Sequence, residues 1–219
     1  MILTDRQIKE AVQAGEIMIE PFDPSQVQPA SIDLRVGEEG ATTKSKKKTN
    51  IRENGFITLD PGDFGVISVF EEIKPSAQHA GRIGLRSKYA RKGLIATTGP
   101  QIDPGYHGRL TLGVTNLTPH PVAIPYKDDI LTLELHRLEQ PSERPYTGPY
   151  QKKLGLGAED LEVIAEGDGM AFSEVLTTLR SLSSNVSDLT AQMKTMQWVI
   201  PAILGVGLTV ITIIVSLGD

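Results

Sequence analysis

The chain has 219 residues, 39% of them hydrophobic and 5% aromatic, which is enough to bury the core of one ordinary domain with further segments attached. Its formal net charge of −5 argues against a general nucleic-acid binder, which is normally basic, so we expect no nucleic-acid partner. The chain has no cysteine, which excludes disulfides and thiolate metal sites and fits a reducing compartment.

The N-terminal segment predicts a capped helix rather than a secretory signal. Thr4 and Gln7 have the spacing of a capping box, and an apolar stripe follows them and ends at Gly15. Between Ile17 and Leu138, short alternating runs such as SIDLRV and RLTLGV are separated by Pro and Gly. Such short strands with tight turns predict a mainly β domain, either a sandwich or a barrel, which we place at residues 1–155.

Residues 156–169 are predicted as a linker, and residues 170–197 as a coiled-coil stalk. Apolar residues there recur at alternating spacings of three and four, which is the a/d pattern of a heptad seam. A single amphipathic helix packed on the β domain is the alternative. The repeating positions are Phe172, Val175, Leu179, Leu182, Val186, Leu189, Met193 and Met196.

Residues 198–217 form a stretch of 20 residues without a charge, from Trp198 to Leu217. As a helix it would be about 30 Å long, the hydrocarbon thickness of a bilayer, so it predicts a single transmembrane helix; a buried core helix is the alternative. Arg180 and Lys194 precede it. The positive-inside rule then predicts a single-pass C-terminal membrane anchor with the β domain in the cytoplasm.

Two turns of the β region carry residues suited to anion chemistry. Arg86, Ser87 and Arg91 combine guanidinium groups with a hydroxyl, which together can bind an oxyanion, although surface ion pairing is the commoner role of a single Arg. Asp103, in the sequence IDPGY, is either a general base or an Asp that caps a turn.

Three motifs, QVQPASIDLRVG (26–37), GRIGLRSKYARKGL (81–94) and IDPGYHGRLTLGVTNL (102–117), resemble the successive motifs of the dCTP deaminase/dUTPase superfamily. The resemblance implies a homotrimer of dUTPase-like distorted β-barrels that bind a deoxynucleoside triphosphate with Mg²⁺ at subunit interfaces, the metal being held through the phosphates. It assigns the catalytic base to Asp103. It assigns nucleotide binding to Gln28, Ser31, Asp33, Arg86, Ser87, Arg91, Tyr106 and Lys153.

The chain departs from the deaminase pattern at two positions. Deaminases of this superfamily carry a proton-shuttling Glu where this chain has Gly113, within Leu112–Asn116. A glycine cannot transfer a proton, and the sequence shows no neighbour that replaces it. In the C-terminal arm, the Lys of the family pattern is Pro149, which leaves Lys152 or Lys153 as its substitute.

These departures favour hydrolysis of dUTP, or a related deoxynucleoside triphosphate, to the monophosphate and pyrophosphate by a membrane-anchored protein. Asp103 would orient the attacking water. The alternative is a catalytically inactive nucleotide sensor that signals through its coiled coil to the membrane. A dCTP deaminase is the third and least favoured hypothesis.

Overall fold

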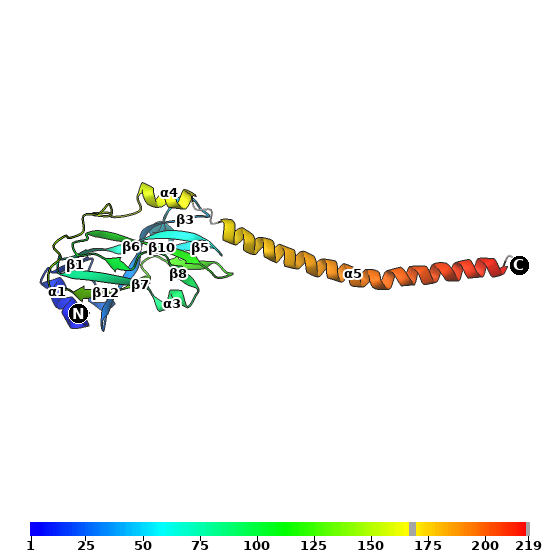
Figure 1. Cartoon of the computed structure of the whole chain (residues 1–219), viewed down its shortest axis with the longest axis horizontal. Coiled ribbons are helices and arrows are strands. Elements are labelled where there is room, and N and C mark those ends of the chain that lie inside the picture. The colour runs from blue at the N-terminus through cyan, green and yellow to red at the C-terminus, as the bar shows by residue number, and fades with distance from the viewer. Residues whose placement is uncertain (167–169, 218–219) are drawn as a thin grey trace. The chain divides into compact units, whose positions relative to one another are not determined.

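The computed structural model describes residues 1–166 and 170–217, with the side chains of 170–177, 202, 203, 206 and 208–217 outside the described set. The chain divides into two compact units, Met1–Ser173 and Glu174–Asp219. The first unit contains the β domain and the second contains most of one long helix (Figure 1).

The β domain is built from short strands with a few short helices, as the Pro and Gly pattern predicted. The helices of this unit are α1 (Asp5–Gln13), α2 (Ile51–Asn54), α3 (Ser87–Ala90) and α4 (Ala158–Glu166), with a 3₁₀ turn at Pro24–Gln26. The strands are β1 (Ile17–Glu20), β2 (Val27–Gln28), β3 (Ser31–Thr42), β4 (Lys48–Asn50), β5 (Phe56–Leu59), β6 (Phe64–Pro75), β7 (His79–Leu85), β8 (Leu94–Ala96), β9 (Gln101–Ile102), β10 (Gly108–Asn116), β11 (Val122–Pro125) and β12 (Asp129–Arg137).

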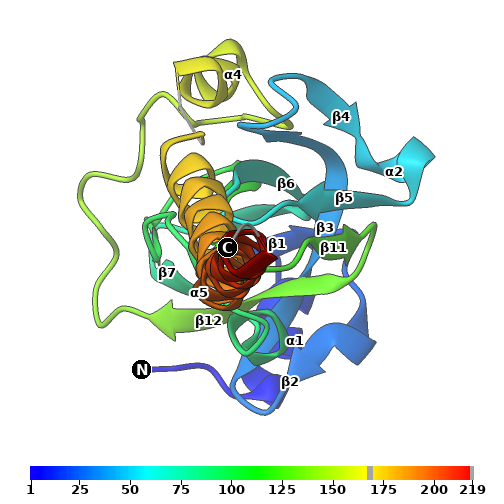
Figure 2. The same ribbon diagram turned by 90° about the vertical axis from the view of Figure 1, so that its right-hand side faces the viewer.

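Ten of these strands form one sheet, in the order β8-β10-β6-β3-β12-β7-β9, with β1 added to β6 and both β2 and β4 added to β3. The remaining two, β5 and β11, pair with each other. Helices α1 and α4 lie on opposite sides of the domain (Figure 2). The prediction of a mainly β domain with an N-terminal helix is therefore confirmed.

The N-terminal helix begins as predicted. Thr4 is its N-cap, and the backbone N–H of Thr4 donates to Gln7 Oε1 at 3.0 Å in a capping box. Ile8 and Ala11 bury the apolar face of α1 in the core, and Gly15 adopts a φ of 72°, a conformation that a residue with a Cβ rarely takes.

Strands β10 and β6 are antiparallel but do not keep one register. Arg109 lies opposite Glu72, and Thr111 lies opposite Ser68. The pairing therefore advances four residues along β6 but only two along β10. Beyond this irregularity the register is regular through Gly113 and Val66 to Thr115 and Phe64. Bulges of this kind bend a strand and redirect side chains, and they recur beside functional sites.

Asn116 closes β10 and joins the end of β5 to the loop between β10 and β11. It is fully buried. Its Nδ2 donates to Leu59 O (2.9 Å) and His120 O (2.8 Å), while its Oδ1 accepts from the backbone N–H and the hydroxyl of Thr118 (2.9 and 2.8 Å). Both amide donors and both acceptor positions are therefore used, which is the condition for burying such a group at little cost.

Helix α4 lies in the segment that the sequence assigned to a linker. It packs on β6 and β3, and Ile164 is fully buried with Leu156, Ala41 and Val66 in a small hydrophobic cluster. The predicted boundaries at 155, 169 and 197 stay predictions, because nothing in the structure tests them as domain limits.

Helix α5 runs without a break from Met170 to Leu217, across both segments that were predicted as stalk and membrane span. Within the described part of the chain, we find no helix with the length and apolar character that crossing a membrane requires. The predicted anchor and the membrane location derived from it are therefore wrong by this criterion. Most side chains of the segment from 202 to 217 lie outside the described residues.

The four hydrogen bonds of Asn116 generate a stability prediction. Replacing Asn116 with Leu leaves the Leu59 carbonyl and the Thr118 backbone N–H without their Asn116 partner, and each such group costs about 1–3 kcal/mol. We expect Asn116→Leu to lower the free energy of unfolding by roughly 3 kcal/mol or more in urea denaturation. The exposed Asn54, changed to Leu, is the control and should shift it by about 0.5 kcal/mol or less. Equal effects of the two changes would contradict this.

Candidate functional site

A first group of predicted residues lies where β3, β7 and β12 meet. Asp33 is 1% exposed and accepts from the Arg86 guanidinium at 2.7 Å and from the Thr132 hydroxyl at 3.1 Å. Burial raises the pKa of Asp33 above its ordinary value, and the charge of Arg86 opposes that rise. The pair fixes Arg86 at the end of β7, where its backbone N–H also donates to Ile130 O.

Ser87 and Arg91 continue this group: Ser87 begins α3 and Arg91 is its C-cap. Both are exposed, and the Arg91 guanidinium donates to Ser87 Oγ at 3.3 Å. Gln28 and Ser31 face each other across the β2–β3 pair and are half-buried. The first group thus presents two guanidinium groups and hydroxyls, which is suitable chemistry for phosphate oxygens.

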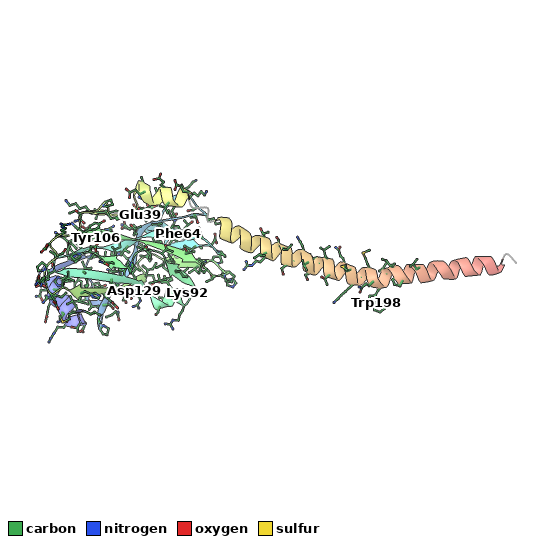
Figure 3. The ribbon with its side chains drawn as sticks, in the orientation of Figure 1. Glu39, Phe64, Lys92, Tyr106, Asp129 and Trp198 are labelled. Carbon is green, nitrogen blue, oxygen red and sulfur yellow. The ribbon has the colours of Figure 1, made fainter. Side chains whose placement is uncertain are left out.

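The second group surrounds a cavity of about 370 Å³ on one face of β10. Tyr106 and Lys153 line it, and none of the six predicted residues of the first group does. Phe64 and Tyr106 appear on the same side of the domain as α4 in Figure 3. The lining is completed by Phe64, Val66, Thr97, Thr98, Gly99, Arg109, Thr111, Gly113, Tyr150, Asp160 and Val163.

Gly113 lies in the wall of this cavity, and neighbouring side chains occupy the space beside it. A Cβ at this position would lie 2.6 Å from Thr97 Oγ1 and 3.2 Å from the Phe64 ring. The Gly113 N–H donates to Thr98 Oγ1 at 2.5 Å. The two threonine side chains thus occupy the surroundings of the position, and a glutamate placed there would displace Thr97.

Arg109 is a cavity residue that the sequence analysis missed. Its Nε is buried and has no hydrogen-bond partner among the described residues. Its carbonyl accepts from the Tyr106 hydroxyl at 3.0 Å, and burial raises the pKa of Tyr106 to about 12, so that phenol stays protonated and neutral. An unpaired buried guanidinium nitrogen beside a cavity is costly unless a ligand supplies an acceptor.

Asp160 was missed as well, because it belongs to the segment predicted as a linker. Its Oδ2 lies 2.5 Å from Lys153 Nζ and accepts from the Gly157 N–H at 2.8 Å. Both side chains of the ion pair are 14% exposed. A signal was available: acidic residues that follow Gly157 and precede apolar positions three apart are typical of a helix start.

Asp103, the predicted catalytic base, does not line the cavity. It is exposed, and its Oδ1 accepts from Gln101 Nε2 at 2.9 Å, while its carbonyl accepts from the Tyr106 N–H. This is the geometry of an Asp that orders a Pro-Gly turn. Within the single chain, Asp103 therefore has a local structural role, and its catalytic role stays a prediction.

Comparison with known proteins identifies the family. Residues 2–138 match the model of the dCTP deaminase-like family. A dCTP deaminase of Thermococcus sibiricus is 38% identical over 151 residues, covering 69% of this chain and 92% of that protein. A dUMP-forming dCTP deaminase of Nanoarchaeum equitans is 36% identical over 195 residues, covering 74% and 98%.

This chain belongs to the dCTP deaminase-like family. The crystal structure of the dCTP deaminase of Agrobacterium tumefaciens has the same fold, with a TM-score of 0.53 at 19% identity over 62% of this chain and 48% of that one. The predicted superfamily is therefore confirmed.

The leading functional hypothesis from the sequence was wrong. It favoured dUTP hydrolysis because Gly113 lacks a carboxylate, whereas the relatives at 31–38% identity are named dCTP deaminases, several of them dUMP-forming. The sensor alternative required a membrane-spanning helix, which the described residues do not contain.

The contacts of Gly113 predict a coupled pair of substitutions. Gly113→Ala places a methyl group against Thr97 Oγ1, and we expect a loss of about 1–2 kcal/mol of unfolding free energy from overpacking. In a Thr97→Ala background that oxygen is gone, and the loss should fall by about half or more.

Thr98→Ala is the matched control for this cycle, because Thr98 Oγ1 accepts from the Gly113 N–H and is not the atom that the new methyl group meets. A Gly113→Ala cost that is the same in all three backgrounds, measured by urea denaturation, would rule out the proposed clash.

Proposed function

We propose that this chain binds dCTP and deaminates it to dUTP with release of ammonia. The observation that carries the proposal is the β10 cavity in a chain of the dCTP deaminase-like family. Phe64, Tyr106 and Tyr150 give it aromatic walls suited to a flat base. The unpaired Nε of Arg109 can donate to an acceptor on the base, such as the O2 carbonyl oxygen of cytosine.

The triphosphate would be bound by the first group. Arg86 is oriented by Asp33, and Ser87 and Arg91 are exposed and hydrogen-bonded to each other, so both groups are accessible to a ligand. Among the described residues, no cluster of three His, Cys, Asp or Glu could hold a metal ion. We therefore propose that Mg²⁺ arrives on the phosphate oxygens of the nucleotide, where it would offset their charge.

The complete site would form between copies of the chain. The cavity takes Tyr106 and Lys153 from one chain, while the residues suited to phosphate lie outside it. A neighbouring copy in a closed homotrimer would bring its Arg86, Ser87 and Arg91 to the cavity of the first. The roles of Gln28, Ser31 and Asp33 would be to shape and hold that phosphate site.

The full-length protein should release ammonia from dCTP in a coupled assay. Arg91→Gln removes a phosphate-binding cation, and Arg109→Gln removes the base-binding donor, so each variant should lose roughly 10²-fold or more in kcat/KM. Lys92→Gln, a change of an exposed cation next to Arg91, should leave activity nearly unchanged. Binding of dCTP by the wild type without any ammonia would overturn the deaminase proposal.

Co-expression of the two defective variants tests whether sites are shared. If each site takes Arg91 from one copy and Arg109 from another, random mixing restores about a quarter of the sites. Each of the two required arginines is present in about half of the chains, and a site needs both. If each site lies within one chain, the mixture will be as inactive as either variant alone.

We also propose that residues 170–197 associate as a coiled coil between copies. The described seam residues from Leu179 to Met196 are each more than half exposed on α5, at alternating spacings of three and four. Burial of this stripe against its counterparts would reinforce the oligomer.

Because the chain has no cysteine, this association can be probed with single cysteines. Leu189→Cys places a thiol in the seam, and mild oxidation should give disulfide-linked dimers on a non-reducing gel. Ala191→Cys, on the opposite face of the helix, should remain largely monomeric under the same conditions. Equal cross-linking of the two would count against a specific seam.

A further inference from the structure

We propose that Asp160 is the proton carrier of this protein, in the role that the resemblance to deaminases would give to a glutamate at position 113. This inference rests on the proposed deamination of dCTP. The reaction needs a group that removes a proton from the attacking water and returns protons to the departing amine. Gly113 cannot do so, and the same cavity contains a carboxylate that comes from α4 instead.

Asp160 is the only acidic residue that lines the cavity among the described residues. Its side chain is 14% exposed, so it is largely shielded from bulk water but not sealed off. Residues of β10 at positions 109, 111 and 113 lie along one wall, and Asp160 with Lys153 lines the same space. A base held between them would have a carboxylate on one side and the bare Gly113 backbone on another.

The contacts of Asp160 leave one oxygen available. Lys153 Nζ and the Gly157 N–H both bind Oδ2, at 2.5 and 2.8 Å. Neither contact uses Oδ1. Two charged or polar donors thus fix the orientation of the carboxylate while its second oxygen can accept a proton, which is the arrangement of a positioned general base.

The surroundings of Gly113 agree with this assignment. The Thr97 hydroxyl lies where a side chain at position 113 would begin, 2.6 Å from an ideal Cβ. A carboxylate on α4 and a glycine on β10 are therefore compatible in this cavity, whereas a glutamate at 113 would need Thr97 to move. In this proposal the carboxylate comes from Asp160 on α4 instead of position 113 on β10, and both positions line the same cavity.

The steps balance with Asp160 unchanged at the end. Water oxygen bonds to C4 of cytosine while Asp160 takes one water proton, the C4–N3 π electrons move to N3, and that proton passes to N3. The intermediate carries a hydroxyl and an amino group on C4. Asp160 next takes the hydroxyl proton and gives it to the amino nitrogen, the C4–N bond breaks, and ammonia leaves with C4=O formed. Residues of this chain supply no oxidant, and none is needed.

Asp160→Asn is the principal test, made in the full-length protein. The amide oxygen can still accept from Gly157 and Lys153, so the fold and the affinity for dCTP should be kept, within about threefold by calorimetry. Ammonia release from dCTP should fall by roughly 10²–10⁴-fold, the usual contribution of a positioned acid–base group. Glu159→Gln, a neighbouring exposed acid on the same helix, is the matched control and should keep its activity.

A second measurement separates proton transfer from structure. Asp160→Ala removes the whole carboxylate, and added formate should restore part of the ammonia release in proportion to its concentration, whereas chloride at equal ionic strength should not. Full activity of Asp160→Asn alongside an active wild type would overturn the role of Asp160 alone. A wild type that binds dCTP without producing ammonia would instead overturn the proposed function. A loss of dCTP binding in Asp160→Asn would assign Asp160 to ligand binding, which also contradicts the inference.

Discussion

The irregular pairing of β10 with β6 is the constraint on which the site depends. Between Arg109 and Thr111 the pairing advances four residues along β6 and two along β10. The strand pair therefore cannot continue there as a flat ladder. The cavity lies along this part of β10, with Arg109, Thr111 and Gly113 in its wall. Beyond the cavity, the four hydrogen bonds of Asn116 end the strand and fix the loops around it. The site thus lies on β10 between the register shift at Arg109 and the hydrogen-bonded end of the strand at Asn116.

Much of the architecture could be predicted because it depends on local patterns. The capping box at Thr4, the alternation of apolar residues and the Pro-Gly turns each act within a few residues, and they specified a mainly β domain with an N-terminal helix. Of the residues that the motifs assigned to nucleotide binding, Tyr106 and Lys153 line one cavity and Asp33 pairs with Arg86, while their binding roles stay predictions. Long-range pairing of the strands could not be deduced from these patterns.

The sequence analysis missed the carboxylate that shares a cavity with Gly113, for a physical reason. Gly113 was considered within its own strand, and the carboxylate that shares its cavity lies 47 positions later on α4, in a segment whose Pro and Gly content suggested a linker. Only packing of α4 on β6 and β3 brings the two together. Arg109 was missed for a similar reason. An Arg in a strand is commonly a surface residue, and the burial of the Arg109 Nε depends on the tertiary fold. The anchor prediction rested on the length of residues 198–217, their lack of charge and the basic residues before them.

Helix α4 begins twenty residues after the region that matches the family. A fold recognised from residues 2–138 can thus be complete in its strands while the acid that we propose for its chemistry is encoded downstream. Under this proposal, a gene rearrangement that replaced the tail would preserve the strands of the domain but remove Tyr150, Lys153 and Asp160 from the cavity. Divergence within such a lineage could therefore proceed by exchange of C-terminal segments, with the β domain inherited intact, and a survey restricted to the shared domain would overlook the difference.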